Sequence, residues 1–333
     1  MMVTKRFILQ SGFKKYFTST WKTDNTSTGS SNSNQVKLPL ESGGTYNFTV
    51  YWGDGSKNTI TAYNQAEVTH TYQSVGSYTI LIEGILKGFR FNNSGDKLKI
   101  LNISKWADLE LKSQGSFLGC NNLTFTATDL LYQNGTSAYE LFRDCYNLNN
   151  TINLTFSNTC TNLGRLFFGC YRLNKSVSNI NFENAVNLTG LFLGCSIFNQ
   201  DITIIAPNCN DFSYMFQSCT AFNKSVSSIN TAKSTTLANM FYDCTNFNQD
   251  ISNFKVGLVT TMSNMLYNCS SFSRTNYDLF LISCYNQAIA TGVQSNVTLT
   301  ANLQNYTLGG TAETARNYLR TTKNWTINDA GGI

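Results

Sequence analysis

Residues 141–149 read LFRDCYNLN, residues 166–174 read LFFGCYRLN, and residues 191–199 read LFLGCSIFN. The same phrase continues as MFQSCTAFN over residues 215–223 and as MFYDCTNFN over residues 240–248. The cysteines of this phrase belong to a series whose successive members lie 25, 25, 25, 24, 25 and 25 residues apart: Cys120, Cys145, Cys170, Cys195, Cys219, Cys244 and Cys269. So regular a spacing predicts stacked repeats, because one unit of this size cannot bury its apolar side alone.

Each repeat carries the same internal pattern. The Leu/Met-Phe pair and the cysteine are spaced like one helical turn that faces inward, and an apolar residue three positions after the cysteine anchors the chain. An asparagine usually follows this anchor, and we expect its side chain to form a ladder with the same residue of adjacent repeats. Because a period near 25 lies within the range of about 20–29 residues for leucine-rich repeats, we expect a leucine-rich-repeat-type solenoid of about 25-residue coils.

A separate β-rich segment precedes the repeats. Residues 46–52 alternate between apolar and polar side chains, and residues 53–55 (GDG) then predict a turn. Residues 68–72 and 78–82 predict two further strands. Residues 22–34 are rich in Ser, Thr, Asn and Gly, which is typical of a loop or a flexible link.

Two known families resemble these segments. Residues 50–56 (VYWGDGS), followed by HTY at residues 70–72 and GSYTI at residues 76–80, resemble a polycystic-kidney-disease-type (PKD) domain, which implies an Ig-like β-sandwich. The repeats resemble BspA-like leucine-rich-repeat surface proteins, whose unit is M-F-x-x-C-x-x-F-N-x-x-I. The resemblance implies adhesion or recognition at a surface and supplies no catalytic residues. It assigns the PKD-like turn and strand hallmark to six residues: Trp52, Gly53, Asp54, Gly55, His70 and Tyr72.

The fold predicted from these features is mainly β with short helices. After Cys269 the repeat phrase decays, and we expect a strand at residues 296–300, a helix at residues 311–319 and a last strand at residues 325–327. The predicted domains are an N-terminal arm and linker (1–34), a PKD-like β-sandwich (35–94), a repeat solenoid (95–275) and a C-terminal capping unit (276–333). The first 21 residues, apolar among basic, predict an arm that docks on this chain or links it into a homo-oligomer.

Composition excludes several function classes. The net charge of +5 is spread along the chain without the concentrated basic face that nucleic-acid binding needs. No apolar run approaches the roughly 18 residues of a membrane span, and the N-terminus carries no recognisable signal peptide. Charged residues make up only 13% of the chain, about half the usual share, and neutral polar residues replace them.

The cysteines and the single histidine predict structural roles. Zinc sites usually contain C-x-x-C pairs and the chain has none, so we expect a reduced cysteine ladder in the core, with disulfides between neighbouring repeats as the alternative. Cys160 and Cys209 suggest a second inward position, whereas Cys284 has no place in the repeat pattern. His70 and Asp54 are expected to hydrogen bond within the β-domain, so no catalytic residue, metal or cofactor is predicted.

Exposed side chains offer a candidate recognition surface. Tyr146, Tyr171 and Tyr242 lie at the corners of their repeats, where aromatic rings can bind protein or carbohydrate, although a ring at such a place can also cover a neighbouring coil. Asp201 and Asp250 recur at equivalent places in alternate repeats, and the other repeats carry Asn-Lys-Ser units there, with Lys175 and Lys224. This alternation predicts charge decoration of one face and does not predict an acid–base pair.

The sequence thus predicts a non-enzymatic surface protein. A thiol-rich core without an export signal favours a virion surface, decoration or spike component, which folds in the cytoplasm and binds other virion structural proteins or a host-surface protein or glycan. The alternative is an extracellular, BspA-like bacterial adhesin on the cell surface that binds host matrix or glycans. A polysaccharide-active enzyme is a third hypothesis, which the absence of a catalytic constellation disfavours.

Overall fold

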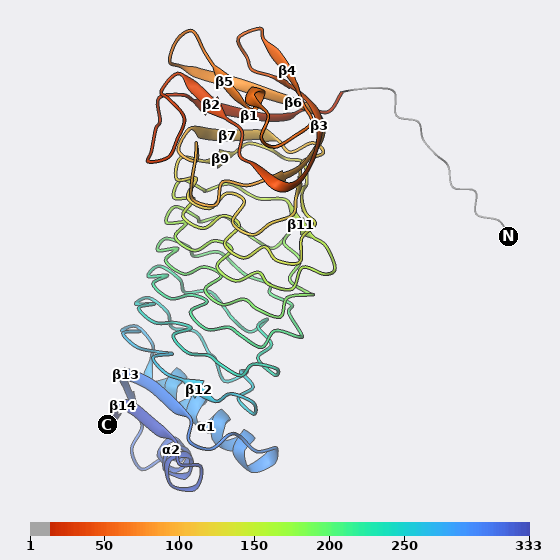
Figure 1. Cartoon of the computed structure of the whole chain (residues 1–333). Helices are drawn as coiled ribbons and strands as arrows, with labels where there is room; N and C mark the ends of the chain where they lie inside the picture. The colour runs from red at the N-terminus through yellow and green to blue at the C-terminus, as the bar shows by residue number, and fades with distance from the viewer. Residues whose placement is uncertain (1–13) are drawn as a thin grey trace, which may run out of the picture.

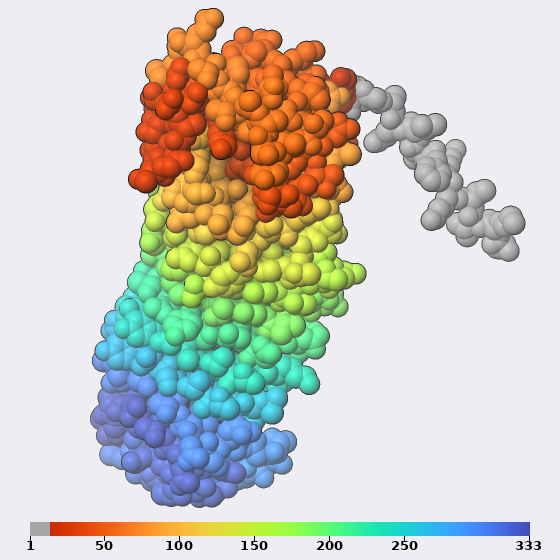
Figure 2. Space-filling view, viewed as in Figure 1, coloured from red at the N-terminus to blue at the C-terminus, as the bar shows by residue number. Residues whose placement is uncertain are grey.

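The computed structural model describes residues 14–333 of the chain. Figure 1 shows an elongated molecule with a curled sheet at its N-terminal end, helices and a small sheet at its C-terminal end, and a column of turns between them. The space-filling view shows the same column as one continuous body (Figure 2). Most of the predicted N-terminal arm, with the self-association assigned to it, falls on residues 1–13 and lies outside the described residues. No helix within residues 14–333 is long and apolar enough to cross a membrane.

The N-terminal half contains one large sheet and one small sheet. The large sheet has nine strands in the order β11-β10-β8-β6-β1-β7-β9, and β3 pairs with both β6 and β4. A second sheet pairs β2 with β5, which a short 3-10 helix precedes. The bounds are β1 Phe17–Lys22, β2 Gln35–Lys37, β3 Leu40–Tyr51, β4 Lys57–Ile60, 3-10 helix Ala66–Val68, β5 Thr69–Thr71, β6 Ser77–Phe89, β7 Ile100–Lys105, β8 Glu110–Leu111, β9 Thr124–Phe125, β10 Leu131–Gln133 and β11 Leu154–Phe156.

The expected Ig/PKD-like β-sandwich is wrong, because the large sheet does not end before the repeats. β6 pairs in parallel with β8 at Lys87 and Glu110, and β8, β10 and β11 then continue the sheet into the repeat region. β1, from the predicted arm, lies between β6 and β7 and pairs antiparallel with both. The first repeats thus cover an edge of the sheet that a separate domain would leave unpaired.

The expected leucine-rich-repeat-type solenoid, with a strand and a short helical return in each coil, is also wrong. Between β11 and β12 (Thr261–Met262) the described chain contains neither strand nor helix. Successive repeats meet instead at single parallel bridges, such as Asn162 with Asn187. Cross-repeat backbone bonds accompany each bridge: the N–H of Phe167, for example, donates to the carbonyl of Leu191 at 3.0 Å.

Left-handed backbone conformations explain why the repeats form turns. In every repeat two residues, one immediately before the ladder cysteine and one four positions earlier, have φ between 54° and 81°. This φ is incompatible with a continuous strand or helix, and favours Gly, Asn and Asp. The positions are Gly115, Gly119, Glu140, Asp144, Arg165, Gly169, Gly190, Gly194, Tyr214, Ser218, Asn239, Asp243, Asn264 and Asn268.

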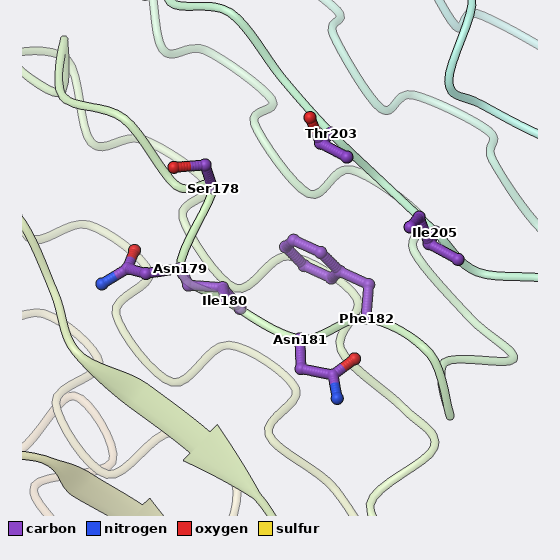
Figure 3. A pocket seen from close by; sticks show the side chains of 7 residues that line it. All are labelled: Ser178, Asn179, Ile180, Asn181, Phe182, Thr203 and Ile205. Atoms are coloured by element: carbon purple, nitrogen blue, oxygen red, sulfur yellow. The ribbon is translucent and has the colours of Figure 1, made fainter.

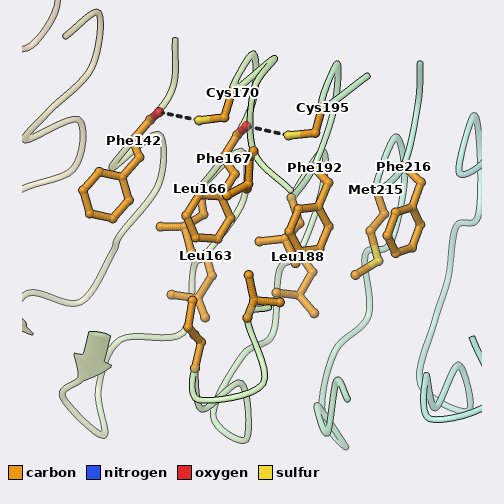
Figure 4. Close-up of a cluster of buried hydrophobic side chains, with 14 of the residues drawn as sticks. Phe142, Leu163, Leu166, Phe167, Cys170, Leu188, Phe192, Cys195, Met215 and Phe216 are labelled. Atoms are coloured by element: carbon orange, nitrogen blue, oxygen red, sulfur yellow. Dashed lines mark hydrogen bonds between the residues drawn. The ribbon is translucent and has the colours of Figure 1, made fainter. Parts of the chain in front are cut away.

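The core runs through the column as stacked phenylalanine rings. Phe142 lies parallel to Phe167 with 6.0 Å between ring centroids, Phe167 to Phe192 at 5.8 Å, and Phe192 to Phe216 at 5.6 Å. Figure 4 shows these rings in register, with leucines and Met215 beside them. Because each ring is fully buried between two neighbours, a repeat's apolar side is covered mainly by the adjacent repeats.

A mixed unit closes the C-terminal end. Its parallel sheet has the order β12-β13-β14, and two helices pack beside it. The helix and two strands predicted after residue 290 are confirmed, although the strands end six and five residues later than predicted, whereas the first helix was not predicted. The elements are α1 Arg274–Ala290, β13 Thr298–Tyr306, α2 Thr311–Thr322 and β14 Thr326–Gly332. Arg316 of α2 binds Asp329 of β14 through two bonds of 2.7 Å, which fixes the last strand against the helix.

Candidate recognition surface

The seven ladder cysteines all lie buried in the core. Six of their thiols donate to the carbonyl of a phenylalanine in the preceding repeat; Cys170 Sγ lies 3.2 Å from the Phe142 oxygen and Cys195 Sγ 3.1 Å from the Phe167 oxygen (Figure 4). Burial raises the pKa of the Cys170 thiol well above its usual value. The remaining three cysteines, Cys160, Cys209 and Cys284, are also buried and unpaired, the last within α1. These thiols are structural groups that a ligand cannot reach.

The PKD-like hallmark residues meet around one buried ring system. Trp52 is buried and stacks on His70 with 4.8 Å between ring centroids. The Tyr72 hydroxyl donates to the Trp52 carbonyl at 2.9 Å. Gly53 has φ +88°, and a Cβ there would lie 2.6 Å from the Thr79 carbonyl oxygen, so only glycine fits. Gly55 also has positive φ and completes the turn.

Asp54 stabilises the same turn. Its carboxylate lies 2.7 Å from His70 Nε2 and accepts bonds from the backbone N–H and the hydroxyl of Ser56. Burial alone would raise the pKa of Asp54, but the bonds from Ser56 and His70 outweigh it and lower the pKa to about 2. Ser56 Oγ is 3.4 Å from the same nitrogen that Asp54 binds, so His70 does not bridge an acid and a nucleophile as a catalytic triad requires.

The three predicted tyrosines belong to two separate pairs, the second of which Tyr267 completes. Tyr146 and Tyr171 are exposed, with 4.9 Å between their ring centroids. Tyr242 is half-buried and stacks on Tyr267 of the next repeat at 5.0 Å with an interplanar angle of 8°. Because Tyr242 stacks one face on Tyr267, that face is covered and does not offer a broad flat platform.

Sequence reasoning missed several residues that belong to the same surface as the three predicted tyrosines. Tyr267 stands two positions before Cys269, as Tyr242 does before Cys244, so the repeat register already contained the signal. Arg143 and Phe168 stand at the same position of earlier repeats, and the Arg143 guanidinium lies 4.5 Å from the centroid of the Phe168 ring. Glu140 bridges Arg143 and Arg165 across two repeats. The arrangement is a mixed aromatic and charged strip suited to contacts with another macromolecule.

A ladder of asparagines orders the corner after each cysteine, as the sequence predicted. The backbone N–H of each ladder residue donates to the side-chain oxygen of the asparagine one repeat earlier, as in Asn174 to Asn149 and Asn199 to Asn174, both at 3.0 Å. The series continues through Asn223 and Asn248 to Ser273. Exposed corner residues are therefore held at one position per repeat along the column.

A shallow hollow opens where the repeat spacing shortens to 24 residues. In the repeats of Cys170, Cys219 and Cys244 a turn precedes the alternating segment, closed for example by the bond from Ile229 N–H to the Val226 carbonyl. Residues 201–206 lack this turn, and Ile204 N–H instead bonds Ser228 Oγ at 3.3 Å. The hollow measures about 250 Å³ and bears no charged side chain (Figure 3). Its lining is Ser178, Asn179, Ile180, Asn181, Phe182, Thr203 and Ile205.

Comparison with known proteins bears on the repeats alone. The model of a family described as "Mycoplasma protein of unknown function, DUF285" matches residues 136–205 and 205–301. No match to the chain was found among curated proteins or solved structures. The family match supports a BspA-like surface protein, whereas neither the PKD-like domain nor leucine-rich repeats as such gain support. By the register of its repeats, the region spanning residues 136–301 is similar to the DUF285 family of Mycoplasma proteins of unknown function.

Proposed function

We propose that this chain is a non-catalytic surface protein for recognition or structure, and more specifically a virion surface component. In this role it acts as a decoration or spike that attaches to other virion structural proteins or to a host-surface protein or glycan. The observation that carries the virion assignment is the state of the cysteines: all ten are buried and unpaired. Proteins that mature in oxidising compartments commonly pair their cysteines, whereas a protein assembled into particles in a reducing cytoplasm keeps its thiols.

The tyrosine pairs and the mixed aromatic and charged strip around Arg143 and Glu140 supply the contact surface in this proposal. Tyr171 is 47% exposed and lies on a corner that the asparagine ladder holds rigidly. A rigid repetitive face loses little conformational entropy on binding, which suits attachment to a large partner.

A second candidate function is a cell-surface adhesin of the BspA-like type that binds host matrix or glycans, and the family match supports the surface location that this function requires. The same face would serve both roles, because the two candidates differ in whether a virion or a cell envelope displays the protein. An adhesin would expose the column on a cell envelope, and its buried thiols would then have to survive oxidising surroundings through burial alone.

Mass spectrometry of the native source separates these candidates. The material is fractionated into purified particles, cell envelope and soluble cytoplasm, and the chain is quantified against a known component of each fraction. Stoichiometric recovery with particles supports the virion assignment, and recovery in the envelope supports the adhesin. Recovery in the soluble fraction alone contradicts both. Turnover of any member of a glycan panel by the purified chain would contradict the non-catalytic role.

A further inference from the structure

A column of alternating charges follows the asparagine ladder along four successive repeats. Lys175 and Lys224 come directly after ladder asparagines, and Asp201 and Asp250 come two positions after them in the repeats between. We call these four residues the charged column. Gln200 occupies the intervening position in the first Asp repeat, where its amide donates to Asn174 Oδ1 at 2.9 Å. The ladder therefore places one charge per repeat, in the order plus, minus, plus, minus.

The charged column is open to solvent. The Asp201 side chain is 92% exposed and lies 3.5 Å from Lys224. Lys175 and Asp250 are exposed, and neither has an ion-pair partner within residues 14–333. An exposed pair such as Asp201–Lys224 adds little to the stability of one chain, so the regular alternation is not explained by folding.

We propose that the charged column is a self-association surface on which a second copy of this chain docks in antiparallel orientation. Reversing plus-minus-plus-minus gives its complement, so Lys175 faces the partner's Asp250 and Asp201 faces the partner's Lys224. A parallel copy in register would place like charges opposite each other. A parallel copy shifted by one repeat would match charges, but it would leave an unpaired surface on each copy and would not form a closed dimer. The antiparallel pairing has the two-fold symmetry of most homodimers.

Residues beside the charged column agree with this register. Ile197, which is 45% exposed and directly precedes the buried anchor Phe198, falls opposite the partner's Ala221 near the two-fold axis. Arg172 falls opposite the partner's Asn246. The next charge along the column, Arg274, falls opposite the partner's Asn150, the neutral residue at the equivalent place in the first repeat of the series. The antiparallel register thus creates an apolar contact at its centre and no like-charge contact.

Analytical ultracentrifugation of the full chain tests the proposal, at about 50 mM and about 500 mM NaCl because salt screens exposed charges. We expect a monomer–dimer equilibrium at low salt that shifts to monomer at high salt. Asp250→Lys and Lys175→Asp should each raise the dimer dissociation constant about tenfold or more, since each places two like-charge pairs in the symmetric dimer. Lys233→Asp, at an exposed lysine off the charged column, changes the net charge as Lys175→Asp does and should leave dimerisation unchanged.

The double variant Lys175→Asp/Asp250→Lys decides the orientation. It restores every antiparallel pair and should return the dissociation constant to within about threefold of the original. In the shifted parallel arrangement, position 175 faces Asp201 of the second copy and position 250 faces its Arg274. The double variant would place like charges at both contacts and would stay dissociated. Thermal melting by circular dichroism verifies that each variant is folded. A wild-type chain that stays monomeric at low salt, a dimer indifferent to the single reversals, or a double variant that fails to recover would each overturn the proposal.

Discussion

Single residues in the column combine burial with one directed bond. Cys195 shows this: its thiol is fully buried and donates to the Phe167 carbonyl, and burial raises its pKa far above the usual range. A thiol that is neither ionised nor accessible cannot act as a nucleophile. The cysteines are therefore small core residues that also bond a carbonyl of the preceding repeat.

Thiol labelling follows directly from this burial. We expect none of the ten cysteines to react quickly with a disulfide reagent at about pH 8 in the folded protein, and all ten to react after denaturation in guanidinium. The absorbance of the released thiolate counts the reacted groups. Rapid reaction of even one equivalent in the native protein would contradict the buried ladder.

Asp54 makes the free energy of unfolding depend on pH in the acidic range. Its pKa is about 2 in the folded protein and about 4 in an unfolded chain, so its contribution is complete above about pH 4 and is lost as pH falls through 2. We expect Asp54→Asn to lower the free energy of unfolding at neutral pH by about 1–2 kcal/mol and to flatten its decline between about pH 4 and 2. Urea unfolding at pH 6 and pH 3 measures both effects; an unchanged pH dependence in the variant would rule out this role for Asp54.

In the repeat region, hydrogen bonds between repeats accompany the turns within each repeat. The asparagine ladder is the clearest case, because each side-chain oxygen accepts the next backbone N–H in series. Asn199→Ala should lower the free energy of unfolding by about 1 kcal/mol, since the N–H of Asn223 loses its acceptor. Asn199→Asp keeps an acceptor oxygen and should lose less.

Asn246→Ala is the matched control for the ladder. Asn246 is exposed at a corner of the same column, and its side chain takes no part in the ladder, so its loss should change the free energy by less than about 0.5 kcal/mol. Chemical denaturation of the three variants compares them. An equal loss in Asn199→Ala and Asn246→Ala would show that the ladder bond contributes nothing.

The sequence predicted the repeat register well and the backbone poorly. Spacing of the cysteines located the buried positions and the asparagine ladder, because both recur with the repeat. It did not predict the turns, although Gly169, Gly194 and Asp243 before the cysteines already favoured positive φ. β1 was missed as a central strand because its partners, β6 and β7, are distant in sequence, and no local pattern shows which strands pair. The tyrosine pairs were only partly found, since Tyr267 was not aligned with Tyr242 in the repeat.

The whole molecule is a column whose middle has almost no regular secondary structure, and ring stacking and hydrogen bonds between repeats hold it together. One such series runs from the N–H of Phe117, Phe142, Phe167, Phe192, Phe216 and Phe241 to carbonyls of the following repeat, at 2.9–3.0 Å. These N–H groups lie beside stacked rings and away from water. Stability should therefore be shared along the column and should not be confined to the sheets at its ends.

Native-state hydrogen exchange tests this central claim most directly. We predict that the amides of this phenylalanine series exchange slowly in every repeat, with protection comparable to that of β6 in the large sheet. Rapid exchange across residues 136–260, with protection only in the sheets and helices at the two ends, would contradict a column held together by its neighbouring repeats.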